Sequence, residues 1–187
     1  MNEDVDLILL DAEDKMQRTL RYLDSELAKI RTGRANVHML DGIVVNYYGT
    51  PTALNQISNI NTPDPRTLAI QPWEKNMIDP IEKAILAANL GLTPMNNGEV
   101  IRINIPILTE ERRRELVKKV KAEGETARIG IRNIRRDANE QLKKLIKEGL
   151  GEDAEKDAEK MVQDMTDKHI TLVDDKLMVK EKDVMTI

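Results

Sequence analysis

The stretch "ARIGIRNIRRDANEQLKK", Ala127–Lys144, has a clear helical pattern that extends through much of this chain. Its isoleucines, alanines and leucines recur in the three- and four-residue steps of an α-helix, and four arginines stand between them. On a helical wheel of about 100° per residue, the apolar side chains gather on one side. They are Ala127, Ile131, Ile134, Ala138, Leu142 and Leu145. The stretch therefore predicts an amphipathic helix whose apolar stripe is buried against a partner.

The same helical period extends far beyond this stretch in both directions. It starts after Pro106, where Thr109 is a suitable N-cap residue, and continues to about Ile146, before Gly149 and Gly151 interrupt it. A helix of about 37 residues is roughly 55 Å long at 1.5 Å per residue. Because such a helix is not stable alone, it must lie against other helices.

Two further amphipathic segments supply those partners. The first runs from Val5 to Ile30, and its apolar positions are Val5, Ile8, Ala12, Met16, Leu20, Leu23, Leu27 and Ile30. The last follows Gly151, and its apolar positions include Ala154, Ala158, Met161, Met165, Leu172 and Val179. Three such helices predict an elongated antiparallel three-helix bundle.

Residues 33–106 have a different pattern. Three stretches rich in β-branched residues predict strands: Ile43–Tyr48, Thr67–Gln71 and Val100–Ile105. Between them "PIEKAILAANLG" predicts a short helix, with Pro80 in its first turn and Gly91 at its end. Asn97-Gly98 predicts a tight turn before the last strand. We expect an α+β protein in which a small β/α/β domain, 33–106, is inserted into a discontinuous bundle formed by 1–32 and 107–187.

An inserted domain requires the chain to cross between the two domains twice. A glycine and a proline at the crossings favour a hinge. Its candidate residues are Arg31, Thr32, Gly33, Ile105 and Pro106. The alternative is that Gly33 only ends a helix and that Pro106 only ends a strand.

Composition and motifs argue against catalysis. The chain has no cysteine, which excludes disulfides, thiol nucleophiles and thiolate zinc sites, and it has no glycine-rich phosphate-binding motif. The only histidines, His38 and His169, stand alone, and His169 falls near an apolar stripe, which favours a packing role over metal ligation. We therefore expect no enzyme activity, no cofactor and no metal.

Nothing in the sequence predicts a membrane protein. No apolar run approaches the roughly 20 residues that span a bilayer. The acidic "NEDVD" after Met1 is typical of neither a secretory signal nor a transit peptide. We expect a cytoplasmic protein.

Charge is unevenly distributed along a chain whose net charge is -4. Residues 107–151 hold 13 basic and 8 acidic side chains, a balance of +5, whereas 152–187 hold 6 and 11, a balance of -5. On the helical wheel, Arg128, Arg132, Arg135 and Arg136 lie along one flank of the buried stripe. Guanidinium groups match phosphate oxygens in a forked geometry, so this flank suits the backbone of structured RNA. The alternative is that these arginines form salt bridges within the bundle.

Two glycines interrupt the long helix. Gly124 and Gly130 each cost about 1 kcal/mol relative to alanine in a helix interior. Close approach of a neighbouring helix would offset that cost at Gly124, whereas the sequence offers no reason for Gly130.

Several blocks of this sequence resemble the ribosome recycling factor family, and they cover nearly the whole chain in order. They are "KIRTGRAN" at 29–36, "LDGIVVNYYGTPTALNQ" at 40–56, "RTLAIQPW" at 66–73, "IEKAILAANLGLTP" at 81–94, "LTEERRRELVK" at 108–118 and "ARIGIRNIRRDAN" at 127–139. Departures from the family pattern are few. They are Val37, Asn97 and Ile129-Gly130-Ile131.

The resemblance implies an L-shaped molecule of two domains, similar in dimensions to transfer RNA, and it also implies the partners of the protein. These partners are the ribosome, through large-subunit ribosomal RNA, and elongation factor G. Elongation factor G hydrolyses the GTP, whereas the recycling factor itself is a monomer and is not an enzyme. The resemblance also implies which arginines contact ribosomal RNA. They are Arg132, Arg135 and Arg136, with Arg113 near the joint and Arg128 as a weaker candidate. A different hypothesis is a structural adaptor whose exposed apolar stripes pair with helices of another protein.

Overall fold

The computed structural model describes residues 3–186, and the chain forms two compact units. One unit combines the residues before Gly33 with those after Thr109, and the other is Gly33–Thr109. The second boundary lies at Glu110, where the long helix begins, whereas the sequence placed it at residue 107.

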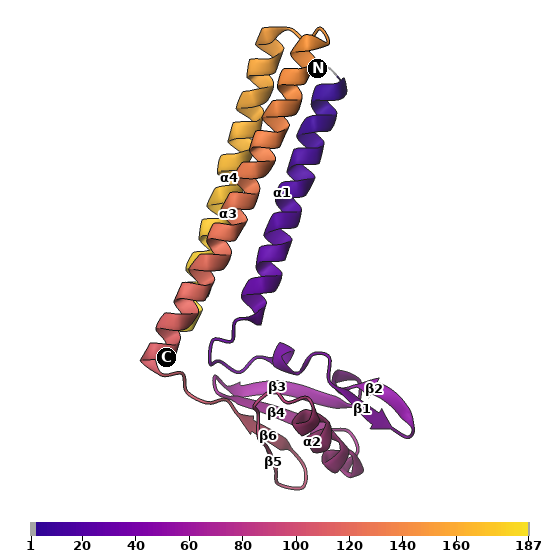
Figure 1. The fold of residues 1–187 in the computed structure, drawn as a ribbon. Coiled ribbons are helices and arrows are strands. Elements are labelled where there is room, and N and C mark those ends of the chain that lie inside the picture. Colours follow the sequence, from indigo (N-terminus) through magenta and orange to yellow (C-terminus); the bar gives the residue numbers. More distant parts are fainter. Residues whose placement is uncertain (1–2, 187) are drawn as a thin grey trace. The chain divides into compact units, whose positions relative to one another are not determined.

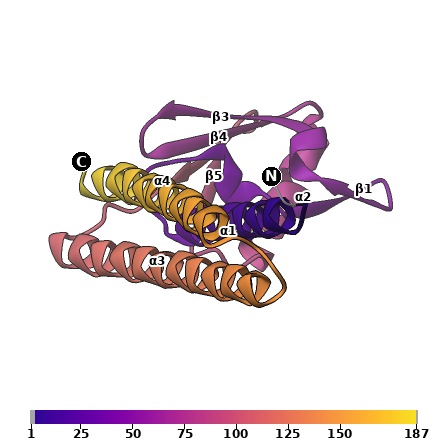
Figure 2. The same cartoon turned by 90° about the horizontal axis from the view of Figure 1, so that it is seen from above.

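Three long helices make up the first unit. They are α1 (Glu3–Lys29), α3 (Glu110–Lys147) and α4 (Glu152–Met185). Helix α3 runs antiparallel to α1 and to α4, and seen from above the three helices lie side by side as a bundle (Figures 1 and 2). The predicted antiparallel three-helix bundle is confirmed. Within residues 3–186, no helix is long and apolar enough to cross a membrane.

The stripes predicted for α1 and α3 face the bundle core. Six of the eight positions predicted for the first stripe are buried. Ile8 is half-buried, and so is Ile30, which follows the end of α1. Buried α3 residues include Ala127, Ile131 and Leu142. They form two successive apolar clusters along the rod, one around Met16 and one around Leu142. Because both stripes face the bundle core, their buried residues are not available to a foreign helix.

The stripe predicted for α4 is wrong at most positions. Of the six apolar residues named for it, only Ala158 is buried and Met165 is half-buried. The residues that α4 buries are Glu155, Ala158, Val162, Thr166, His169, Val173, Leu177 and Val184. Polar side chains can occupy this face because they bond within the helix: the Thr166 hydroxyl donates to the Val162 carbonyl at 2.7 Å, and His169 Nδ1 lies 2.7 Å from the Met165 carbonyl. His169 is thus a buried packing residue.

Helix α4 packs closely against α3 at Gly124. A Cβ atom placed on Gly124 would lie only 2.2 Å from Leu177 Cδ1. Leu177 is itself buried in the apolar cluster around Met16. This contact explains why a glycine stands there in mid-helix. Gly130 is different, since a Cβ there would meet only Thr19, at 3.5 Å.

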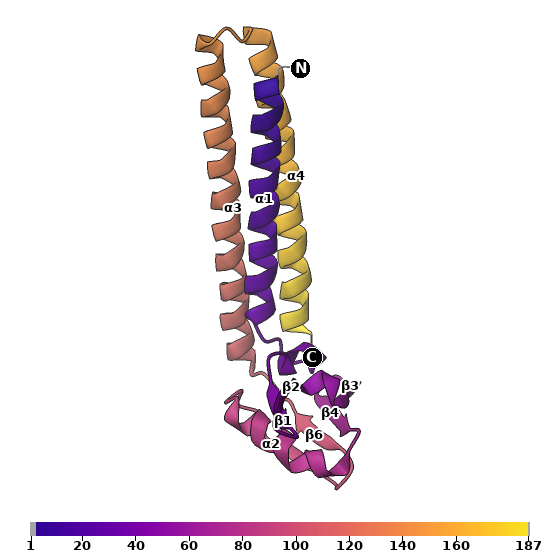
Figure 3. The same ribbon diagram turned by 90° about the vertical axis from the view of Figure 1, so that its right-hand side faces the viewer.

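The second unit is a small α/β fold with six strands. They are β1 (Val44–Tyr47), β2 (Thr50–Ala53), β3 (Ser58–Asp64), β4 (Thr67–Pro72), β5 (Pro94–Asn96) and β6 (Ile101–Asn104). β1 and β2 form a hairpin, and the others form an antiparallel sheet in the order β3-β4-β6-β5. Helix α2 (Ile78–Ala87) packs its buried face on the core that β4 and β6 share, and Figure 3 shows it beside the strands. The expected insert with a sheet and one helix is therefore present.

The sequence missed β2, β3 and β5, and the sheet order explains two of these misses. β3 and β5 are the edge strands, so each pairs on one side only. Edge strands tolerate proline and polar residues, and these strands contain Pro63 and Pro94. The β-branched pattern that identifies β4 and β6 belongs to strands that are paired on both sides.

Two turns of the small unit depend on residues with positive φ. The β1–β2 hairpin turns at Tyr48 and Gly49, with φ of 47° and 84°, and Asn46 Oδ1 accepts a hydrogen bond from the Gly49 N–H at 2.8 Å. Positive φ at both central residues fits a tight hairpin turn, but it is uncommon for a tyrosine. Pro80 lies in the first turn of α2 as predicted, whereas the helix ends at Ala87, before Asn89 (φ 51°), and not at Gly91.

Candidate nucleic-acid interface

The four arginines of the flank lie on one surface of α3 because the helical period places them beside its buried stripe. Arg132 and Arg136 are exposed, and Arg128 and Arg135 are half-buried next to α4. The structure shows what each guanidinium group contacts, and these contacts divide the four arginines into two pairs.

Arg128 connects α3 to α4. Its Nε donates to Asp174 Oδ1 at 3.1 Å, and its Nη2 donates to the same oxygen. Its Nη1 donates to Glu125 Oε2 at 3.3 Å, and only 25% of the side chain is exposed. The hydrogen bond to Asp174 raises the pKa of Arg128, while partial burial opposes that rise. Arg128 is therefore engaged in holding the bundle together.

Arg135 is held in a similar way, but by a neutral group. Its Nη1 donates to Gln163 Oε1 on α4 at 3.1 Å, and Gln163 Nε2 in turn donates to Asp167 at 2.8 Å. This chain of hydrogen bonds fixes the direction of the guanidinium group. Because the Gln163 amide is neutral, this hydrogen bond does not compensate the positive charge of Arg135.

Arg132 and Arg136 make only weak contacts along their own helix. Arg132 Nη1 lies 3.3 Å from Glu125 Oε1, and its side chain is 49% exposed. Arg136 Nη2 lies 3.3 Å from Asn133 Oδ1. Both contacts are near the long limit for a hydrogen bond, so both guanidinium groups can turn toward an incoming phosphate. We refer to Arg132, Arg135 and Arg136 as the arginine surface.

Arg113 lies apart from this surface and is buried. Its Nη1 donates to the carbonyl oxygens of Val184 and Thr186, at 2.9 and 3.0 Å, where α4 ends. Carbonyls at a helix C-terminus have no partners within the helix, so a buried cation there satisfies them. The sequence contained no signal for this contact, since the partners are more than 70 residues apart. The salt bridge from Arg128 to Asp174 was likewise foreseen only as a general possibility.

The five candidate hinge residues occupy different environments. Arg31, Thr32 and Gly33 follow α1 without regular structure, and Gly33 has φ of 75°. Leu108 packs against Gly33, since a Cβ there would lie 2.8 Å from Leu108 Cγ. Ile105 is buried and its N–H donates to the Arg66 carbonyl at 2.7 Å, whereas Pro106 is exposed. Ile105 is thus anchored in the small unit, and Pro106 is the first exposed residue of the second crossing.

The fold defines a class of protein in which an α/β unit is inserted between the first and second helices of a three-helix rod, and the second of these helices is basic. The sequence profile described as "Ribosome recycling factor" matches residues 23–185. The chain belongs to the ribosome recycling factor family.

Individual relatives agree over the full length. A ribosome-recycling factor of Flavobacterium johnsoniae is 51% identical, and the match covers the whole of both chains. A ribosome-recycling factor of Legionella pneumophila is 53% identical, and the match covers 95% of this chain and 96% of that relative. A solution structure of the ribosome recycling factor has a TM-score of 0.81 at 40% identity and covers all of both chains. A structure of T. thermophilus ribosome recycling factor with E. coli elongation factor G on the E. coli post-termination complex has a TM-score of 0.64 at 45% identity and covers 97% of this chain and 99% of that one.

Proposed function

We propose that this protein binds the post-termination ribosome through the arginine surface of α3 and, with elongation factor G and GTP, separates the ribosomal subunits. The observation that carries the proposal is the arginine surface itself, in a member of this family. Its guanidinium groups lie on one helix. Arg135 and Arg136 have neutral partners, and Arg132 makes one 3.3 Å salt bridge, to the exposed Glu125. Arginine binds phosphate through two parallel hydrogen bonds, so a row of such groups suits an RNA backbone.

Arg132 and Arg136 are the primary contacts in this proposal. Each would exchange a 3.3 Å contact within α3 for a phosphate oxygen, at little cost to the bundle. Arg135 contributes from a fixed position beside Gln163. Arg128 and Arg113 support the surface indirectly, because their donors are already bonded to α4.

The remaining roles follow from the family. The relative solved with elongation factor G supports the same partner here, and hydrolysis of GTP belongs to that partner. In this proposal the protein is a cytoplasmic monomer that binds no cofactor and catalyses no reaction. Burial of the apolar stripes of α1 and α3 favours a ribosome-binding factor over a structural adaptor.

Subunit separation in this proposal involves movement at the two crossings. The first crossing, Arg31 to Gly33, and the second, from Pro106, have no regular secondary structure. Contact between Gly33 and Leu108 keeps the two crossings side by side within the small unit. We infer that Ile105 is the fixed end of this joint, because it is part of the sheet core.

Substitution of Arg132 tests the proposal. We expect Arg132→Ala to weaken binding to the large ribosomal subunit roughly tenfold, as expected for loss of a charge-assisted contact. Subunit splitting with elongation factor G and GTP should slow at limiting factor concentration. Arg18→Ala is the matched control, because Arg18 is an exposed arginine of the same bundle that pairs with Asp14 on its own helix. Equal effects of the two substitutions would show that the arginine surface has no special role.

A further inference from the structure

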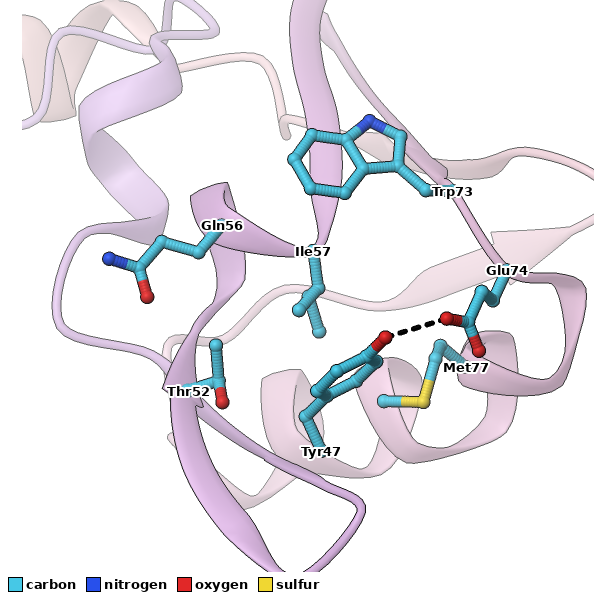
Figure 4. A pocket seen from close by; sticks show the side chains of 7 residues that line it. All are labelled: Tyr47, Thr52, Gln56, Ile57, Trp73, Glu74 and Met77. Atoms are coloured by element: carbon cyan, nitrogen blue, oxygen red, sulfur yellow. Dashed lines mark hydrogen bonds between the residues drawn. The ribbon is translucent and has the colours of Figure 1, made fainter.

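The small unit contains a pocket that the sequence did not predict. It has a volume of about 220 Å³, and its lining includes Tyr47, Ile57, Trp73, Glu74 and Met77. Figure 4 shows the indole of Trp73 on one side and the ring of Tyr47 on the other, with Ile57 between them. Ile57 and Met77 are buried, so the base of the pocket is apolar and its two sides are aromatic.

A carboxylate is held at one side of this pocket. The Tyr47 hydroxyl donates to Glu74 Oε1 and the Tyr48 hydroxyl donates to Glu74 Oε2, each at 2.6 Å. These hydrogen bonds lower the pKa of Glu74, so its negative charge persists at neutral pH. Each carboxylate oxygen has a second lone pair for another donor. The pocket thus combines aromatic faces with a fixed anion.

Two aromatic residues at the pocket expose large apolar surfaces to water, which is energetically unfavourable. Trp73 is 63% exposed and Tyr48 is 71% exposed, in a chain that has only four aromatic residues. Tyr48 also has φ of 47°, a conformation that L-residues other than Asn and Asp rarely adopt. Its ring packs edge-on against Tyr47, with centroids 4.7 Å apart, and its hydroxyl is bonded to Glu74. Strained backbone kept in place by such contacts is typical of binding sites.

We propose that this pocket binds the side chain of an arginine presented by a protein partner. A planar guanidinium group stacks on aromatic faces and donates to a carboxylate, and the pocket offers both. Its volume is below the roughly 300–1,000 Å³ of small-molecule sites, which suits one inserted side chain.

The fixed carboxylate also discriminates between classes of partner. A nucleic acid could stack a base on Trp73, but its phosphates would lie close to the Glu74 charge and be repelled. No arginine or lysine lines the pocket to compensate that charge. The site therefore favours a basic protein surface, and it belongs to a different unit from the arginine surface of α3.

Fluorescence of Trp73 tests the assignment directly, because it is the only tryptophan in the chain. The full-length protein is titrated with a blocked Gly-Gly-Arg-Gly-Gly peptide, and then with peptides carrying lysine or citrulline in place of arginine. We expect saturable binding of the arginine peptide with a Kd on the order of 1 mM, the affinity expected for a single side chain. Citrulline has nearly the same shape without the charge, and we expect it to bind at least about tenfold more weakly.

Two matched variants test whether the carboxylate of Glu74 binds the arginine side chain. Glu74→Gln should weaken binding of the arginine peptide roughly tenfold, whereas Glu99→Gln should leave it unchanged. Glu99 is an exposed residue of the same unit that pairs with Lys75 at 3.0 Å and does not line the pocket. The comparison of arginine with citrulline needs no substitution, so it remains valid if Glu74→Gln unfolds the small unit.

Three results would overturn the proposal. They are equal binding of the citrulline peptide, equal effects of Glu74→Gln and Glu99→Gln, and tighter binding of a short single-stranded RNA than of the arginine peptide. The last result would assign the pocket to base stacking. The assay contains no ribosome, so its outcome is independent of whether Arg132 binds ribosomal RNA.

Discussion

Arg128 on α3 and Asp174 on α4 form a salt bridge in which two donors of one guanidinium group converge on a single carboxylate oxygen. The two residues are 46 positions apart in sequence. This salt bridge distinguishes Arg128 from the other three arginines of the flank. Arg128 is thus paired with a carboxylate on α4, whereas the arginine surface contacts Glu125, Gln163 and Asn133.

A double-mutant cycle should detect this salt bridge. We expect Arg128→Ala and Asp174→Ala to show a coupling of about 0.5–1 kcal/mol in the free energy of unfolding, because Asp174 is half-exposed and solvent weakens the pair. Urea denaturation of the four proteins measures it. A coupling of zero would mean that the pair contributes nothing to stability in solution.

The two glycines of α3 should respond in opposite directions to substitution by alanine. Gly124→Ala places a Cβ against buried Leu177, and we expect a net destabilisation of about 1–3 kcal/mol. Gly130→Ala meets only Thr19 at ordinary contact distance, and we expect a gain of about 0.5–1 kcal/mol from helix propensity. Urea denaturation measures both changes. In a Leu177→Ala background, Gly124→Ala should become stabilising, and if it does not, steric conflict with Leu177 is the wrong explanation.

Removal of the buried guanidinium group at the end of α4 should destabilise the protein. Arg113→Ala leaves the carbonyls of Val184 and Thr186 without their donor, and we expect a loss of about 2 kcal/mol. Arg113→Lys should recover part of it, because an ammonium group retains the charge. Thermal unfolding compares the two variants. Any loss of ribosome affinity beyond the unfolded fraction would measure a direct contact of Arg113 with RNA.

Loss of the Tyr47 hydroxyl should raise the pKa of Glu74. The hydrogen bond from Tyr47 is the largest cause of the lowered pKa, followed by that from Tyr48. A carboxyl group with a lowered folded-state pKa stabilises the fold above its unfolded-state pKa, and this stability is lost as the pH falls through the folded-state pKa. Because the unfolded-state pKa of Glu74 is unchanged in Tyr47→Phe, we expect the loss to be complete at a higher pH than in the unchanged protein. Carboxyl NMR titration of Glu74 measures the pKa directly, and an unchanged value would refute the assigned cause.

Salt should weaken binding to the large subunit, and the dependence should identify the contributing arginines. Each phosphate contact that is lost reduces the slope of log affinity against log salt by about 1. We expect this reduction in Arg132→Ala and no change in Arg18→Ala. Filter binding over a series of KCl concentrations measures the slope. A slope near zero in the unchanged protein would exclude phosphate contacts as the source of affinity.

Local pattern predicted the elements whose residues interact mainly with near neighbours. The α1 stripe and the arginine flank of α3 follow from a period of 3.6 residues, which is a property of a single helix. β4 and β6 were recognisable because strands paired on both sides need apolar, β-branched residues. The same reasoning failed for β3, whose edge position tolerates proline and polar residues.

The amino-acid pattern was sufficient to predict three amphipathic helices, an α/β insert between the first two, and a row of arginines beside a buried stripe. The folded structure was needed to identify the buried face of α4, since Thr166 and His169 occupy it by bonding within their own helix. It also decided that Arg128 pairs with Asp174, that Arg113 caps α4, and that Trp73 and Tyr47 enclose one pocket. A helical pattern can be recognised from residues within four positions of each other. The contacts of Arg128 and Arg113 join residues 46 and 71 positions apart, which only folding brings together.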